Sequence, residues 1–213
     1  MRRCNLIGTA LCAGVLVLWG SGAQAEEFSA RLDGFQELGS LPNVTQNATT
    51  GVVTAANPTG AILSDGTATA KLRLDRAAGT VDYELTYSNV GTTPPLTGTV
   101  TQAHIHFGKA RDSGGIMVFF CTNLTPPVGP PTPKACPLNS GTVTGTWTKA
   151  DVVAIPGQNV TAMDFDALED ALTSNTAYAN IHTMALGAGE IRGQVHKGDL
   201  DEKHDDHESH EHR

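Results

Sequence analysis

Apolar and polar residues alternate along most of this chain, in short stretches separated by turn-forming residues. The alternation runs without a fault through residues 67–74 and, after a turn at 75–79, resumes through 81–87. Side chains of a β-strand point alternately to opposite faces, so this pattern predicts a β-hairpin with one buried face. Similar stretches predict further strands at residues 28–32, 52–55, 99–107, 116–120 and 142–147. The pattern as a whole predicts an all-β domain, an antiparallel sandwich or barrel.

Two short segments carry helical signals instead. Thr148 is a candidate N-cap for residues 149–153, with Asp151 three positions further on. Residues 164–172 place their apolar side chains on one helical stripe. Both segments are short, so we expect one or two connector helices in a β-domain.

Three histidines lie within two of the strand-like segments. His104 and His106 share one face of the segment 99–107, and His182 lies in the segment 178–183. Imidazole is a good ligand for copper and zinc, and the spacing of His104 and His106 directs both rings to one point. The alternation puts all three on faces away from the apolar core, where loops can cover them. This predicts a metal site outside the sandwich, against the simpler interpretation that the three side chains are only solvated.

The segments 178–183 and 190–196 predict a second hairpin, joined by a glycine-containing connection. Its apolar residues face the core, and its polar residues fall on the same side as His182. The polar set supplies candidates for a further ligand and for groups that support the ligands. The further-ligand candidates are Glu190 and His196, and the supporting candidates are Asn180 and Arg192.

At 213 residues the chain has the length of a single domain preceded by a targeting segment. Residues 1–25 carry two arginines directly after Met1, continue with an apolar run and end in Ala-Gln-Ala, as secretory signal peptides do. The run is too short for a membrane span. We therefore expect cleavage near Ala25, a periplasmic or secreted location, and a domain over residues 26–198.

Cysteine usage agrees with export. Cleavage near Ala25 leaves Cys121 and Cys136, and an even pair in an exported protein predicts a disulfide. The bond closes a proline-rich loop, which stabilises a fold by roughly 3 kcal/mol in the chain-entropy model. A metal-thiolate or redox pair is the alternative interpretation.

The formal net charge of −8 disfavours nucleic acid and anionic membrane surfaces as partners. Much of this charge lies in residues 199–213, which have almost no apolar side chains and predict a disordered tail. Histidines interleaved with carboxylates make this tail either a flexible metal chelator or an acidic solvating segment. The tail histidines are His204, His207, His210 and His212.

Taken together, residues 103–106, 178–183 and 189–194 resemble the CHRD domain, a family named from chordin and found in many exported bacterial proteins. The matching motifs are Ala-His-Ile-His, Tyr-Ala-Asn-Ile-His-Thr and Gly-Glu-Ile-Arg-Gly-Gln. The resemblance covers about residues 28–197. It implies the Greek-key β-sandwich of Cu/Zn superoxide dismutase, so residues 26–198 are expected to form one CHRD-like sandwich of this type.

Two predictions of function remain open, and in the first the chain is an exported protein that binds copper or zinc through His104, His106 and His182. The alternative is a non-catalytic extracellular binding or scaffold module, with a protein or matrix partner and structural histidines. A dismutase-like enzyme is the less favoured prediction. Arg192 is similar to the arginine that guides superoxide to copper, but the chain lacks a second histidine and aspartate group for zinc. Since fold similarity does not carry activity, we expect no catalysis.

Overall fold

The computed structural model describes residues 25–38, 60–125, 129 and 133–198. Residues 1–24 of the signal peptide predicted at 1–25, the strand predicted at 52–55 and the tail at 199–213 lie outside the described residues. Within the described residues, no helix has the length and apolar character needed to cross a membrane.

The described residues form nine strands and three short helical segments, which confirms the all-β prediction. The strands are β1 (Glu26–Asp33), β2 (Thr67–Asp75), β3 (Thr80–Ser88), β4 (Val100–Phe107), β5 (Gly115–Thr122), β6 (Gly141–Trp147), β7 (Ala177–Thr183), β8 (Ile191–Gln194) and β9 (His196–Lys197). The helical segments are η1 (Lys149–Asp151), η2 (Pro156–Gln158) and α1 (Phe165–Thr173). Thr148 and Asp151 form the reciprocal cap expected at η1, and α1 matches the second predicted connector, whereas η2 has no counterpart among the predictions.

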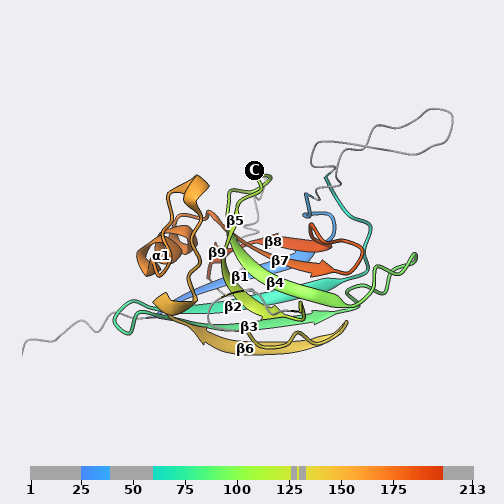
Figure 1. Cartoon of the computed structure of the whole chain (residues 1–213), viewed down its shortest axis with the longest axis horizontal. Coiled ribbons are helices and arrows are strands. Elements are labelled where there is room, and N and C mark those ends of the chain that lie inside the picture. Colours follow the sequence, from blue (N-terminus) through green and yellow to red (C-terminus); the bar gives the residue numbers. More distant parts are fainter. Residues whose placement is uncertain (1–24, 39–59, 126–128, 130–132, 199–213) are drawn as a thin grey trace, which may run out of the picture.

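The strands make one antiparallel sheet folded into two layers (Figure 1). The first layer has the order β5-β4-β7-β8 and the second layer has the order β1-β2-β3-β6, with β9 beside β1. A single pair, Asp33 and Arg192, connects β1 to β8. Strands β4 and β7 are neighbours although β5 and β6 lie between them in sequence, an over-and-across connection of the Greek-key kind.

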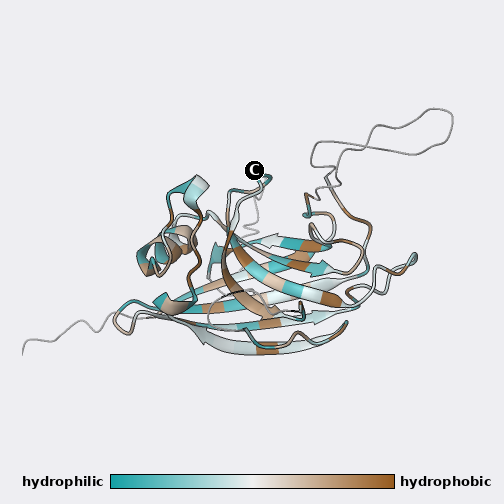
Figure 2. Ribbon diagram, viewed as in Figure 1, coloured by the Kyte–Doolittle hydropathy of each residue, from teal (hydrophilic) through white to brown (hydrophobic). Residues whose placement is uncertain are grey.

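The core lies between the two layers and is built from the apolar members of each alternating strand. Hydrophobic and hydrophilic residues follow one another along the strands (Figure 2). In β3 the buried residues occupy every second position, as the sequence predicted. The largest fully buried side chains include Trp147, Phe28, Phe120, Leu85 and Ile181. Their burial is the main favourable contribution to folding.

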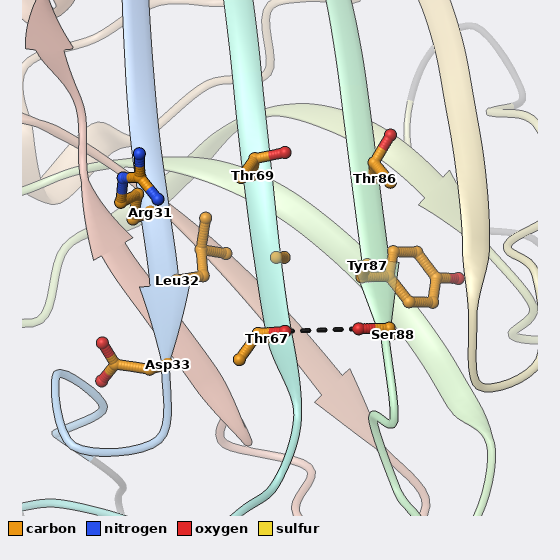
Figure 3. Close-up of a pocket in the computed structure, with 9 residues that line it drawn as sticks. Arg31, Leu32, Asp33, Thr67, Thr69, Thr86, Tyr87 and Ser88 are labelled. Atoms are coloured by element: carbon orange, nitrogen blue, oxygen red, sulfur yellow. Dashed lines mark hydrogen bonds between the residues drawn. The ribbon is translucent and has the colours of Figure 1, made fainter. Parts of the chain in front are cut away.

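The outward-facing residues of the second layer stay in contact with solvent. Arg31, Thr67, Thr86 and Ser88 are exposed, and they help to line a shallow pocket across the ends of β1, β2 and β3 (Figure 3). The hydroxyl groups of Thr67 and Ser88 are 3.3 Å apart across β2 and β3. This face is an ordinary solvated sheet surface.

Side chains close the seam where β5 of the first layer meets β6 of the second. Trp147 Nε1 donates to the carbonyl of Phe119 at 2.8 Å, and the Tyr83 hydroxyl donates to the carbonyl of Phe120 at 3.2 Å. On β6, Lys134 Nζ donates to the carbonyl of Thr144 at 2.6 Å. The rings of Tyr83 and Trp147 also stack, with centroids 4.4 Å apart. Polar and aromatic side chains thus join the two edges of the rolled sheet.

A disulfide joins Cys121 and Cys136, with Cα atoms 5.0 Å apart, as predicted. Asn123 reinforces this link, because its side chain donates to the carbonyls of Val100 and Cys136 and accepts from the Cys136 amide. The disulfide therefore fastens the segment that leads into β6 to the end of β5.

Candidate metal centre

The pairing of β4 with β7 brings the three histidines together. His104 lies opposite Asn180, and Gln102 lies opposite His182, so His182 is one step along the sheet from His104. His106 follows on the same face of β4. Ala103, Ile105 and Ile181 point the other way and are fully buried in the core. The histidines therefore occupy the outer face of the first layer.

This outer face is covered, unlike that of the second layer. His104 is fully buried, while His106 and His182 are 8% and 5% exposed. The Phe119 ring of β5 meets His104 edge-on, with centroids 4.6 Å apart. Loops 108–114 and 184–190 supply backbone contacts to the other two rings. The three histidines are thus buried from solvent, although they lie on the face that the alternation assigned to the outside of the core.

Two backbone carbonyls define the protonation pattern of the cluster. His106 Nδ1 is 2.9 Å from the carbonyl oxygen of Gly114, and His182 Nδ1 is 3.0 Å from that of Gly187. A carbonyl only accepts, so both Nδ1 atoms carry hydrogen, and both Nε2 atoms of the neutral rings keep a lone pair. Neither Nε2 has a hydrogen-bond partner, and neither nitrogen of His104 has one.

The three rings present a compact set of donor atoms. One nitrogen from each of His104, His106 and His182 lies within 4.8 Å of the other two. Among the described residues, no other group of three or more histidine, cysteine, aspartate or glutamate side chains brings its donor atoms together in this way. The cluster therefore has the composition of a three-imidazole metal centre.

Burial keeps all three rings neutral. It lowers the pKa of His106 and of His182 to about 4, although the carbonyl contacts at Gly114 and Gly187 act in the opposite direction. Burial also holds the pKa of His104 well below its usual value, and the neighbouring His182 and His106 add to this effect. Neutral imidazole is the form that binds a metal ion, so the cluster is in that form at pH 7.

Tyr178 and Arg192 support the position of His106. The Tyr178 ring stacks on the His106 ring at 4.7 Å with an angle of 2° between the planes. The Arg192 guanidinium lies 3.4 Å from the centre of the Tyr178 ring, and its Nη2 donates to the carbonyls of Lys109 and Asp112. Arg192 therefore fixes loop 108–114, and this loop supplies the Gly114 carbonyl.

Asn180 holds a third segment over the same face. Its Nδ2 donates to the Glu37 carboxylate and, at 3.2 Å, to the carbonyl of Ile191. Glu37 is 4% exposed and was not among the sequence-based candidates, because it lies in the turn after β1, where no alternation operates. Gly189 leaves room for this contact, since a Cβ there would collide with Glu37 and Asn180.

Glu190 does not lie with the histidines. It is fully buried, and its carboxylate accepts hydrogen bonds from the Ser64 hydroxyl at 2.7 Å, the Gly91 amide at 2.8 Å, and the hydroxyls of Thr97 and Thr183. The alternation assigned it to the side of Arg192, but Glu190 precedes the first residue of β8, so the strand pattern does not reach it. Its structural position is that of an anchor for three loops.

His196 also lies away from the cluster. It is exposed in β9 and pairs with Ser29 of β1, because β8 ends at Gln194 and the chain changes partner there. Of the two residues proposed as further ligands, the structure therefore brings neither to the three histidines. Of the two proposed as supports, it places both Asn180 and Arg192 on the outer face beside them.

Comparison with known proteins gives a family match. The family model described as CHRD domain matches residues 28–195, a span that contains the three histidines, the supporting residues and the disulfide. No curated protein matches the chain. No solved structure matches it either.

Proposed function

Because the chain belongs to the CHRD domain family, we propose that it binds one transition-metal ion, copper or zinc, through His104, His106 and His182. The supporting observation is the set of buried imidazole nitrogens without partners: Nε2 of His106 and His182, and both nitrogens of His104. A buried polar atom without a partner costs free energy, and buried polar groups in folded proteins are nearly always paired. A single metal ion would satisfy one nitrogen from each ring.

The residues around the cluster also fit a metal. Histidine ligands usually donate their second ring N–H to a carbonyl or carboxylate, which fixes the ring and its tautomer. Gly114 and Gly187 provide such carbonyls for His106 and His182. The Nε2 atoms of these rings and one nitrogen of His104 would hold the ion, which would supply Lewis acidity or, for copper, redox chemistry.

Arg192 argues against a dismutase. An arginine that attracts a small anion from solvent must present its charge there, but Arg192 is 3% exposed and its guanidinium is committed to Tyr178, Lys109 and Asp112. We therefore propose metal binding without dismutase activity.

The second candidate function is an extracellular binding or scaffold module with structural histidines. Ring packing favours it, because His104 meets His106 at 5.3 Å and His182 at 4.8 Å in edge-to-face arrangements typical of aromatic clusters. In this case the partner would be a protein or matrix component. It leaves the unpaired nitrogens unexplained, so metal binding is the stronger proposal.

We further propose that the protein acts in the periplasm or is secreted. The disulfide between Cys121 and Cys136 supports this, since such bonds persist in oxidising compartments. The signal-like residues 1–25 point the same way. The domain would span residues 26–198, and the histidines of residues 199–213 would provide a separate, flexible metal-binding segment.

The test is a copper and zinc titration of the chain from residue 26 to 213, with His204, His207, His210 and His212 all changed to alanine. We expect one equivalent of metal, nitrogen ligands in its X-ray absorption spectrum, and loss of both in His106→Ala. His196→Ala is the matched control, because His196 is exposed and outside the cluster. Absence of stoichiometric binding in the protein with an intact cluster would reject the proposal.

A further inference from the structure

The three-histidine cluster contains no negative charge. Its donors are three neutral rings, and the nearby carboxylates are used elsewhere. Glu190 accepts four hydrogen bonds at the loop anchor, and Glu37 accepts from Asn180. Both cysteines of the described residues are joined in the disulfide. No ligand of the cluster would therefore neutralise the charge of a bound ion.

The surroundings of the cluster raise the free-energy cost of burying a charged ion. The three rings are at most 8% exposed, and the Phe119 and Tyr178 rings pack against them. The Arg192 guanidinium lies against the same Tyr178 ring that stacks on His106, and its positive charge lowers the pKa of His106, so it also opposes a cation at this ring. The cost of burying an ion grows with the square of its charge, so a divalent ion costs about four times as much as a monovalent ion of similar size.

The number of donors points the same way. Zinc held by three histidines takes a water as its fourth ligand, and divalent copper favours tetragonal sites with four or more ligands, so both ions need a further ligand here. Among the described residues, the cluster offers three nitrogens and no fourth histidine, cysteine or carboxylate within the same distance. A soft monovalent ion that accepts two or three imidazoles matches this set.

We infer that the cluster selects monovalent copper over zinc and over divalent copper. This inference rests on the proposed function, because it names the ion that the three histidines hold. Tighter binding of the monovalent ion raises the reduction potential of bound copper, so the site keeps copper reduced. His104 is suited to this ion because no hydrogen bond restrains either of its nitrogens.

The experiment compares the affinities of three ions for the same protein. The chain from residue 26 to 213 with the four tail histidines changed to alanine is titrated anaerobically with monovalent copper against a chromophoric competitor, and in parallel with zinc and with divalent copper. We expect monovalent copper to bind at least a thousandfold more tightly than zinc. X-ray absorption should show two or three nitrogen ligands and no oxygen ligand.

A charge variant tests the cause of the selectivity. Phe119→Asp places a carboxylate beside His104, and Phe119→Asn is the matched neutral control. We expect the aspartate variant to narrow the preference for monovalent copper over zinc at least tenfold relative to the asparagine variant. Circular dichroism identifies folded variants, and the ion comparison in the protein with Phe119 intact does not depend on them.

The outcomes separate the two proposals. Zinc binding that equals or exceeds that of monovalent copper, and that disappears in His106→Ala, would overturn the inference and leave the proposed function standing. Failure of every ion to bind stoichiometrically would reject the proposed function and the inference with it.

Discussion

The two outer faces of the sandwich start from the same sequence pattern and end in opposite environments. On the second layer, the outward residues of β1, β2 and β3, such as Arg31, Thr67 and Thr86, are exposed (Figure 3). On the first layer, the outward residues His104 and Asn180 are at most 2% exposed. Alternation therefore assigns a side chain to a face, but loops decide whether that face is wet or dry.

The covering loops of the first layer are held by specific polar contacts. Arg192 binds loop 108–114, Asn180 binds the turn that contains Glu37, and Glu190 fastens the end of loop 184–190. The contacts of Arg192 and Asn180 join residues at least 80 positions apart in sequence, and Glu190 also reaches Ser64 and Gly91 across 126 and 99 positions. The dry outer face is thus a tertiary feature, and changes that loosen the loops should make it resemble the second layer.

The largest expected difference between the faces is in acid sensitivity. In the metal-free protein, burial lowers the pKa of His106 and His182 to about 4, whereas in the unfolded chain the pKa is near 6.5. As the pH falls from about 6.5 to 4, the unfolded chain binds protons that the folded protein excludes. The free energy of unfolding should therefore have its full value above pH 6.5 and decrease by several kcal/mol as the pH falls to 4.

Urea denaturation in the presence of a chelator, from pH 7 to pH 4.5, measures this effect. His182→Asn should reduce the slope by about 1.4 kcal/mol per pH unit. Thr86→His adds a histidine to the exposed face and should leave the slope unchanged. An equal slope in His182→Asn and the unmodified protein would contradict the assignment of the acid sensitivity to the cluster.

Removal of the loop anchor should have the next largest effect. Glu190→Ala deletes a buried acceptor and leaves the Gly91 amide and three hydroxyl groups without it, so we expect a loss of roughly 3 kcal/mol in the free energy of unfolding. Hydrogen exchange should also rise in loop 184–190. Ser88→Ala, on the exposed face, is the control and should change stability by less than about 0.5 kcal/mol. Similar losses in both variants would show that Glu190 is no anchor.

The smallest expected effect is that of replacing Arg192 by lysine, with the same replacement of Arg31 on the exposed face as its control. Arg192→Lys keeps the charge but loses the planar group that stacks on Tyr178 and reaches Lys109 and Asp112, which should cost about 1 to 2 kcal/mol. Metal affinity should fall about tenfold, because the loop that orients His106 loosens. Arg31→Lys on the exposed face should change neither quantity. Calorimetric titration measures the metal affinity, and thermal unfolding measures the stability. Identical behaviour of the two variants would contradict the supporting role of Arg192.

The sequence predicted the strands, the faces and the grouping of the three histidines because all of these follow from local alternation. It misassigned Glu190 and His196 because each lies just beyond the end of β8, where alternation no longer applies. It missed Glu37 because the contact with Asn180 joins residues 143 positions apart. The alternation of the sequence also could not predict that the cluster is buried, since this burial depends on loops held by Arg192 and Glu190.

The side-chain closure of the β5 and β6 seam has a consequence for how copies of this protein meet. An unpaired strand edge offers its carbonyls and amides to a strand of another molecule. Along β5, the carbonyls of Met117, Phe119 and Phe120 already accept from the Val153 amide, Trp147 and Tyr83, and on β6 Lys134 occupies the carbonyl of Thr144. These contacts occupy carbonyls on both edge strands, β5 and β6. The rolled sheet is therefore protected there against pairing with a strand of another molecule.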